Sequence, residues 1–364
     1  MNVAQTKLWS ASLLTIMVLV TAGRAQSVES AHARSMQSIT NSLASLPEAD
    51  TIIYSSPQRI FSEAAPKVVP PADLAKMRAG FADIKKAVGI DPGSIDYIAV
   101  AIRFQKPASD LSFVPPDLLA VFGGDFSADS LITLASLYSQ DRARNEKYGS
   151  KTLTIMKIDP IAEQAIKNPL LKPYSEIGVV ALNANTLAVG NLNYLKSAVD
   201  ANEGNGRISP AALGSLLRDP NALVSAAGSP LTAFAKSFGL LGTQTAPRDA
   251  QCSSRFGDFY AAITMSGTNF SLRGAMNTDN PDTAKIMNGL ISGLLQQAIS
   301  SVPDKDAQTV LKNIRMLARD NEIVWEADVP EQTLAAMIRE EMKPKPVSTP
   351  TQPKPKPRRR VRRK

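Results

Sequence analysis

The chain has 364 residues, of which 44% are hydrophobic and 20% are charged, and its formal net charge is +8. These values are typical of a globular protein with room for two domains or one large double-layered domain. One cysteine, Cys252, and one histidine, His32, exclude an intramolecular disulfide, a zinc finger and a histidine-rich zinc site.

The positive charge is confined to the C-terminal segment. Residues 343–364 contain ten Lys or Arg and no acid. Without this tail and without Lys7 and Arg24, the chain has 29 basic and 33 acidic residues. The body is therefore mildly acidic, and any attraction to an anionic partner must come from the tail.

Residues 1–25 have the features of a secretory signal peptide. Lys7 precedes 16 residues without a charge, and Gly23 and Ala25 supply small side chains before a cut at Gln26. The apolar run is shorter than the roughly 20 residues that a stable membrane-spanning helix needs. We therefore expect a periplasmic or secreted protein, and an uncleaved N-terminal anchor is the alternative.

The first α+β repeat is expected at residues 26–207, with an N-terminal helix that includes His32 as a packing residue. Apolar residues at steps of three and four predict helices, and alternating apolar residues predict strands. The spacing predicts helices at 28–46, at 58–65 with an end at Pro66, at 72–88 with Gly89 as C-cap, at 127–138 and at 191–201. It predicts strands at 51–54, 95–104, 117–126, 151–158, 176–183 and 186–190, a charged loop at 140–150 and a flexible break at 202–207.

The stretch from 95 to 138 organises this half. Alternation places Ile98, Val100 and Ile102 on one face of the first strand, while Ala99 and Ala101 on the other face allow a helix to pack closely. Gly123 and Gly124 precede a helix, which suggests a phosphate loop, but neither GxxxxGK[ST] nor GxGxxG is present. We interpret the glycine pair as a turn and Ser127 as the cap of the following helix.

The second α+β repeat, residues 208–342, follows the same order of elements, which predicts an internal duplication. Its long helix, 282–299, is expected to bury Met287, Leu290, Leu294 and Ala298. Gly289 and Gly293 on this helix are expected to allow close contact with the sheet. Cys252 falls in an irregular loop at 243–257, where we expect a bystander thiol.

The predicted fold class is therefore α+β, with two tandem related halves of antiparallel strands covered by helices after an N-terminal helix. The leader, the opening Leu46-Pro47-x-x-Asp50 and the tandem halves resemble a loosely defined class of exported bacterial proteins of unknown function. The resemblance covers roughly residues 46–342, and it implies export and no known catalysis. Leu217-Arg218-Asp219-Pro220 stands in the corresponding place of the second half, which departs from the motif.

The tail, residues 343–364, is expected to be disordered and extended, because alternating Lys and Pro resist helix and sheet. No aromatic residues interleave with its charges, so nucleic acid is not the expected partner. Outside a cell, the available polyanions are lipid headgroups and wall polymers. A solubilising tail without a fixed partner is the alternative. The candidate anion-binding residues are Lys354, Lys356, Arg358, Arg359, Arg360, Arg362, Arg363 and Lys364.

The sequence contains no GxSxG, SxxK or HExxH motif, and we predict no catalytic residues, no cofactor and no metal site. Three functions remain open. The first is a non-enzymatic envelope protein, a binding module tethered by its basic tail. The second is a periplasmic carrier of an apolar ligand, based on small strand residues such as Ala99 and Ala101 or Ala261 and Ala262. The third is a hydrolase that uses acids or a lone serine.

Overall fold

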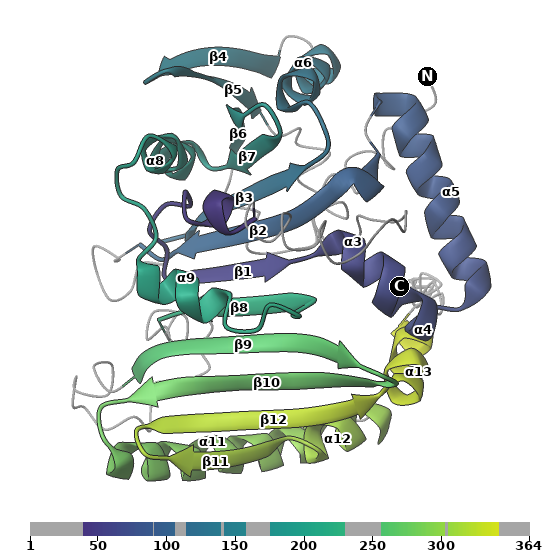
Figure 1. Cartoon of the computed structure of the whole chain (residues 1–364), viewed down its shortest axis with the longest axis vertical. Coiled ribbons are helices and arrows are strands. Elements are labelled where there is room, and N and C mark those ends of the chain that lie inside the picture. Colours follow the sequence, from purple (N-terminus) through teal and green to yellow (C-terminus); the bar gives the residue numbers. More distant parts are fainter. Residues whose placement is uncertain are drawn as a thin grey trace, which may run out of the picture.

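A computed structural model of the chain has the α+β architecture that the sequence predicts: one broad antiparallel sheet with helices on both faces (Figure 1). The structure describes residues 39–89, 91–105, 114–139, 142–157, 175–229, 256–302 and 305–341. The predicted signal peptide, His32, Cys252 and the tail lie outside these ranges. Of the predicted first helix, the structure describes residues 39–46, of which 39–43 are helical.

Twelve described strands form a single sheet in the order β11-β12-β10-β9-β8-β1-β2-β3-β7-β6-β5-β4, and each neighbouring pair is antiparallel. The strands of the first half are β1 (Thr51–Ser55), β2 (Ile95–Arg103), β3 (Asp117–Gly124), β4 (Ala143–Tyr148), β5 (Lys151–Lys157), β6 (Glu176–Asn183) and β7 (Thr186–Gly190). Those of the second half are β8 (Val224–Gly228), β9 (Phe256–Ser266), β10 (Asn269–Thr278), β11 (Arg315–Arg319) and β12 (Glu322–Pro330).

The two halves share one strand order and meet at the pair β1–β8. Outward from this pair, the first half runs β1-β2-β3-β7-β6 and the second runs β8-β9-β10-β12-β11. The first half adds the hairpin β4–β5 beyond β6. Ile52 of β1 lies opposite Ala227 of β8, so the sheet continues from one half into the other.

The helices connect and cover these strands (Figure 1). In the first half they are α3 (Pro57–Arg59), the π-helical turn η1 (Ile60–Ala64), α4 (Ala65–Val68), α5 (Pro71–Val88), the 3-10 turn η2 (Pro92–Ser94), α6 (Ala128–Ser139) and α8 (Leu192–Asn202). In the second half they are α9 (Pro210–Leu216), α11 (Pro281–Ser301), α12 (Lys305–Lys312) and α13 (Glu331–Glu341).

The main core lies on the sheet face that carries Ala99 and Ala101, which we call face A. Both alanines are fully buried, in one apolar cluster with residues of α8 and of the segment 39–46, as their small size predicts. Tyr194 and Leu195 of α8 are also fully buried in this cluster. Ala99 and Ala101 therefore belong to a filled core, and they do not support the cavity that the carrier hypothesis expected there.

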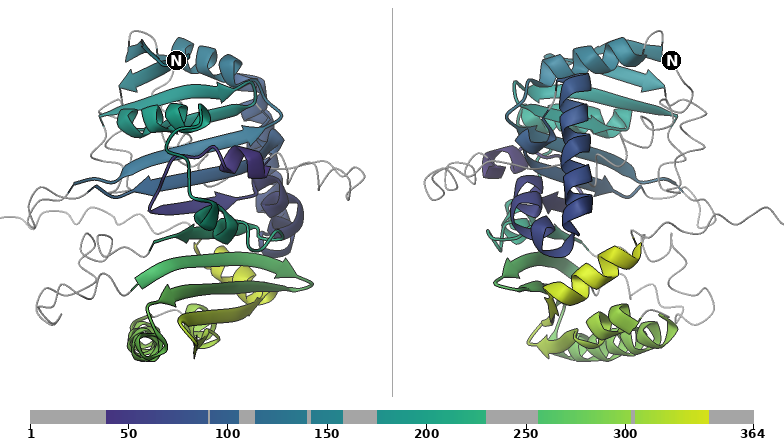
Figure 2. Two further views of the ribbon diagram at one scale, coloured as in Figure 1. Left: turned by 60° about the vertical axis from the view of Figure 1, so that its left-hand side comes forward. Right: turned by 90° about the vertical axis from the view of Figure 1, so that its right-hand side faces the viewer.

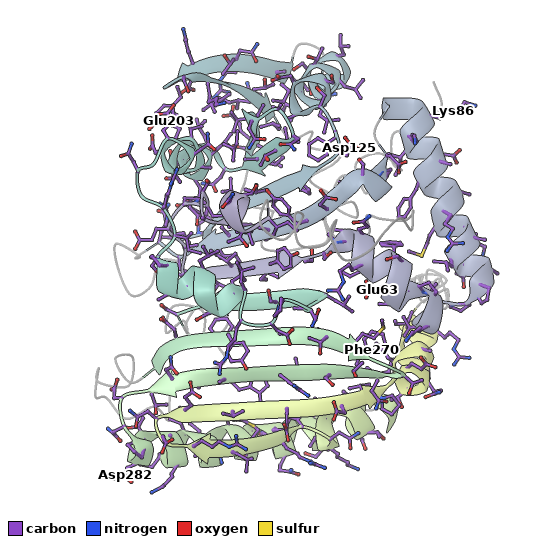
Figure 3. All side chains as sticks on the ribbon, viewed as in Figure 1. Glu63, Lys86, Asp125, Glu203, Phe270 and Asp282 are labelled. Carbon is purple, nitrogen blue, oxygen red and sulfur yellow. The ribbon has the colours of Figure 1, made fainter. Side chains whose placement is uncertain are left out.

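The opposite face, face B, carries α11, α12 and α13 (Figure 2, right). The correspondence between the halves ends here, because α8 covers face A whereas its expected counterpart α13 packs on face B. Phe270 and Val329 meet the apolar side of α13 on face B (Figure 3 labels Phe270). On face A, the part of these strands near Phe270 and Val329 carries the polar pair Ser271 and Asp328 and the charged pair Arg273 and Glu326, which offer α13 less apolar surface than face B does.

The helix predicted at 58–65 does not end at Pro66, which corrects our prediction. Helical structure continues to Val68 through the π-helical turn η1. Pro66 lies in the first turn of α4, where a backbone N–H is not required for the helical ladder. A local π turn thus accommodates a residue that normally stops a helix.

The charged segment 140–150 is also not a loop throughout, because Ala143–Tyr148 forms β4. The strand pairs with β5 through a turn in which Gly149 has a φ of 53°. Its charged side chains are consistent with its position at the edge of the sheet, where charge discourages pairing with other chains. Charge therefore marked an edge strand here and not a loop.

The C-cap of α5, the N-cap of α6 and the hairpin between β6 and β7 are as the sequence predicts. Gly89 ends α5 with a φ of 72°, and its N–H donates to the carbonyl of Lys85. Ser127 caps α6 by accepting from the N–H of Ser130. A two-residue turn joins β6 to β7. The segment 202–207 turns tightly and pairs back on the start of the body, since the N–H of Ile208 donates to the carbonyl of Leu46.

Of the four residues predicted to be buried on the long helix α11, only Met287 faces the sheet, and Ala298, like two of the others, is exposed. Ala284, Met287 and Ile291 face the sheet, whereas Leu290 and Leu294 are 54% and 53% exposed. Gly289 and Gly293 lie on the exposed side, where an added Cβ would meet nothing within 4 Å. The predicted close contact between these glycines and the sheet is therefore wrong, because the helix has two apolar sides and the sequence does not show which one packs.

Replacing Gly289 and Gly293 with alanine should raise the free energy of unfolding by about 0.5–1 kcal/mol for each residue. Both lie in the middle of α11, where an added Cβ meets nothing, and alanine loses less conformational entropy on folding than glycine does. The free energy of unfolding in urea measures the gain. Gly124→Ala is the contrasting variant, since its Cβ would lie 2.0 Å from the carbonyl oxygen of Ser94. Destabilisation by all three substitutions would contradict the placement of α11.

Candidate functional site

The predicted anion-binding residues, from Lys354 to Lys364, all lie outside the described residues. Their role remains a prediction. The described residues offer three other candidate sites: a buried polar cluster, a pair of acids and an exposed apolar part of the sheet.

The buried polar cluster centres on Asp117 at the start of β3. Its side chain is 4% exposed and accepts from Nη2 of Arg103 at 2.8 Å and from Nε of the same residue at 3.1 Å. Nδ2 of Asn191 donates to its other oxygen at 2.6 Å, while Oδ1 of Asn191 accepts from the N–H of Leu118. Asp117 is thus held by two neighbours from β2 and from the cap of α8.

Tyr194 joins this cluster to the start of the body. The Arg103 guanidinium lies 4.5 Å from the centre of the Tyr194 ring, and the Tyr194 hydroxyl donates to the carbonyl of Glu48 at 2.9 Å. Burial raises the pKa of Tyr194 far above its ordinary value, although the nearby Arg103 opposes the shift. The phenol therefore stays protonated, and it acts as a hydrogen-bond donor and not as a base.

The role of this cluster is to stabilise the fold, and its polar groups are not free to bind a ligand. Each polar side chain in it has a partner, and the carboxylate of its acid is bound by a cation and an amide.

In the part of the chain that the structure describes, no group of three His, Cys, Asp or Glu could hold a metal ion. The same residues include no helix that is long and apolar enough to cross a membrane.

Asp96 and Asp125 form the acid pair, near the start of β2 and the end of β3. Burial raises the pKa of the Asp96 carboxyl, and the charge of Asp125 raises it further. A carboxylate hydrolase would require two acids that act together at one site. Asp125 is exposed, and the glycines beside it serve packing, since a Cβ on Gly123 would clash with the ring of Tyr97. The glycine pair is not the predicted turn, because both residues belong to β3 and pair with β2, where a larger side chain at either position would clash.

The third feature is an exposed apolar part of face B in the middle of the sheet, which we call the open sheet face. Its residues come from four adjacent strands and face the same side through direct pairing. Two of them, Ile53 and Ile263, are 37% and 39% exposed, and the others are half-buried. The open sheet face consists of Val100 of β2, Ile53 of β1, Ala226 of β8, and Ala261 and Ile263 of β9.

Sequence reasoning named Ala261 in this region but missed its neighbours. It paired Ala261 with Ala262, which lies on face A and is 3% exposed. Ile53 was missed because β1 is apolar on both faces, so its short pattern does not distinguish the buried side from the open one. Thr51, two residues earlier on the same face, has a buried hydroxyl without a hydrogen-bond partner.

Comparisons with known proteins show no family. No family model matches the chain, and no curated protein matches it. Among solved structures, crystal form III of TP0453 is 12% identical with a TM-score of 0.43, covering 82% of this chain and 97% of that one. Crystal form I of TP0453 is 10% identical with a TM-score of 0.41, covering 82% and 96%. At these values the likeness supports no statement about the function of this chain.

Proposed function

We propose that this chain is an exported, non-enzymatic envelope protein whose α+β body is a binding module and whose basic tail tethers it to anionic surfaces. The observation that carries the proposal is the separation of charge: ten basic residues and no acid in residues 343–364, after an acidic body. A body of this charge is repelled by anionic headgroups, so the tail must supply the attraction.

Removing residues 343–364 should reduce binding to vesicles of phosphatidylglycerol and phosphatidylcholine by at least about 100-fold, because each Lys or Arg near an anionic surface contributes about 1 kcal/mol. Cosedimentation of the full and the shortened chain with these vesicles measures the difference. Added salt should weaken the binding of the full chain.

The matched control keeps the length and prolines of the tail. Glutamine replaces the eight candidate residues from Lys354 to Lys364, and this chain should bind as weakly as the shortened one. Vesicles of phosphatidylcholine alone should bind none of the three chains. Equal binding of the full and the shortened chain to anionic vesicles would refute the tether.

The second candidate function is a carrier of an apolar ligand, and the open sheet face favours it. Soluble proteins normally cover the apolar side of a sheet with helices or a second sheet. Exposed apolar patches commonly mark sites for partners or ligands. This function and the tether are compatible, since the first concerns the body and the second concerns the tail.

A further inference from the structure

We propose that residues 230–241 form an amphipathic helix that packs on the open sheet face, so that the chain itself covers this apolar surface. Residues 230–255 connect β8 to β9 and lie outside the described residues. The inference goes beyond the tether, and it assigns to the chain a surface that the second candidate function assigns to a ligand. Three features support it: the place where the segment leaves the sheet, its counterpart in the first half, and its apolar pattern.

The segment leaves the sheet beside the open sheet face. β8 ends at Gly228, which lies opposite Thr51. Ile53 and Ala226 lie two residues from this end of the strand pair, or about 7 Å. Two residues suffice to join antiparallel neighbours such as β8 and β9. Residues 230–255 join them here, so the connection is long enough to reach back over the sheet.

The first half leaves the sheet at an equivalent place. The N–H of Ser56, directly after β1, donates to the carbonyl of Leu223 at 2.9 Å. The N–H of Ser229, directly after β8, donates to the carbonyl of Asp50 at 2.8 Å. These two hydrogen bonds cross the pair β1–β8 in opposite directions, as a two-fold relation between the halves requires. Directly opposite residues of this pair face the same side, so the relation keeps equivalent segments on the same face of the sheet.

A proline follows each serine. Pro57 is the first residue of α3, and the helical run that it begins packs on face B, where Ala64 and Val68 lie in one cluster with Phe270. Pro230 holds the same position in the second half, and proline at the first helical position favours the start of a helix. The repeat therefore predicts a helix that begins at Pro230 and lies on face B, at the strand ends beside Ile53.

The apolar pattern of the segment matches this surface. Leu231, Phe234, Phe238 and Leu241 recur at steps of three and four, which places them on one side of a helix. Lys236, the only charged residue of this stretch, falls on the opposite side. Twelve helical residues extend about 18 Å, enough to cross the four strands of the open sheet face, which span about 14 Å. Packing of the stripe on the sheet removes apolar surface of both from water.

The test measures the access of a small reagent to Ile53 in the full chain. Cys252→Ser removes the only cysteine and provides the background. Ile53→Cys should react with N-ethylmaleimide at least about tenfold more slowly than Leu290→Cys on the exposed side of α11. Phe234→Ser together with Phe238→Ser should raise the rate at Ile53→Cys by about tenfold and leave the rate at Leu290→Cys unchanged. Mass spectrometry of the labelled chain measures both rates.

A cross-link tests the same contact with only one phenylalanine removed at a time. Under mild oxidation, Ile53→Cys should form a disulfide with Phe234→Cys or with Phe238→Cys, and none with Lys236→Cys on the opposite side of the helix. Equal maleimide rates at Ile53→Cys and Leu290→Cys would overturn the proposal. A disulfide that forms as readily with Lys236→Cys as with the phenylalanine positions would do the same.

Two further outcomes would assign the cover to another occupant and would also overturn the proposal. Protection of Ile53→Cys that falls on dilution of the protein would point to a second copy of the chain. Protection that is lost after treatment with a lipid-removing resin would point to an apolar ligand, as in the second candidate function. The chain without residues 343–364 should keep the protection, so failure of the tether and failure of this inference are distinguishable.

Discussion

Replacing Tyr194 with alanine should lower the free energy of unfolding by about 3–5 kcal/mol, the usual cost of deleting a large aromatic side chain from a packed core. Tyr194 is fully buried, stacks against Arg103 and donates to the carbonyl of Glu48. It therefore connects α8, β2 and the start of the body. Urea denaturation followed by circular dichroism measures the loss.

Tyr194→Phe separates the hydroxyl from the ring. Phenylalanine keeps the packing and loses one hydrogen bond to a backbone carbonyl, so it should cost only about 1 kcal/mol. If both variants lose the same stability, the ring packing that we describe around Tyr194 is not what stabilises this part of the core.

The second large effect is expected at Asp117. Asp117→Ala should destabilise the protein by about 3 kcal/mol, because it leaves Arg103 and Asn191 without their acceptor in a largely buried place. The same urea denaturation measures this loss. Replacing the pair together, with Asp117→Leu and Arg103→Met, should recover much of the stability, since no unpaired charge then remains.

The matched control is the ion pair between Arg144 and Glu176 at the edge of the sheet. The N–O distance of 2.6 Å in this pair is shorter than the 2.8 Å between Arg103 and Asp117. Both side chains of the pair are nevertheless substantially exposed. Glu176→Ala should therefore cost no more than about 1 kcal/mol. If Glu176→Ala lowers the free energy of unfolding more than Asp117→Ala does, burial does not decide which of the two ion pairs stabilises the protein more.

The open sheet face lies where it does because the helices of the two halves cover different faces of the sheet. In the first half, α8 finds an apolar face A and fills it, as the burial of Ala99 and Ala101 shows. In the second half, α13 packs beside α4 on face B, at the ends of the strands. Helices thus occupy face B near Phe270 and near Met276 and leave Ile53 and Ile263 between them exposed.

The types of element and much of their order follow from the local pattern of residues. Alternation identified β2 and predicted that a helix would pack on Ala99 and Ala101, because side-chain direction follows directly from the pleat. Gly89 marked the end of α5 through its left-handed conformation. The separate charge of the tail needed no structure, since it is a property of composition.

The tertiary structure alone decided which apolar surfaces are covered. Leu290 and Met287 lie on two different apolar sides of α11, and only the sheet beneath the helix selects the side that is buried. Likewise, the pairing of β1 with β8 joins the halves into one sheet and brings Ile53 beside Ala226. Such contacts between distant segments depend on complementary surfaces in three dimensions, which a local pattern of residues does not encode.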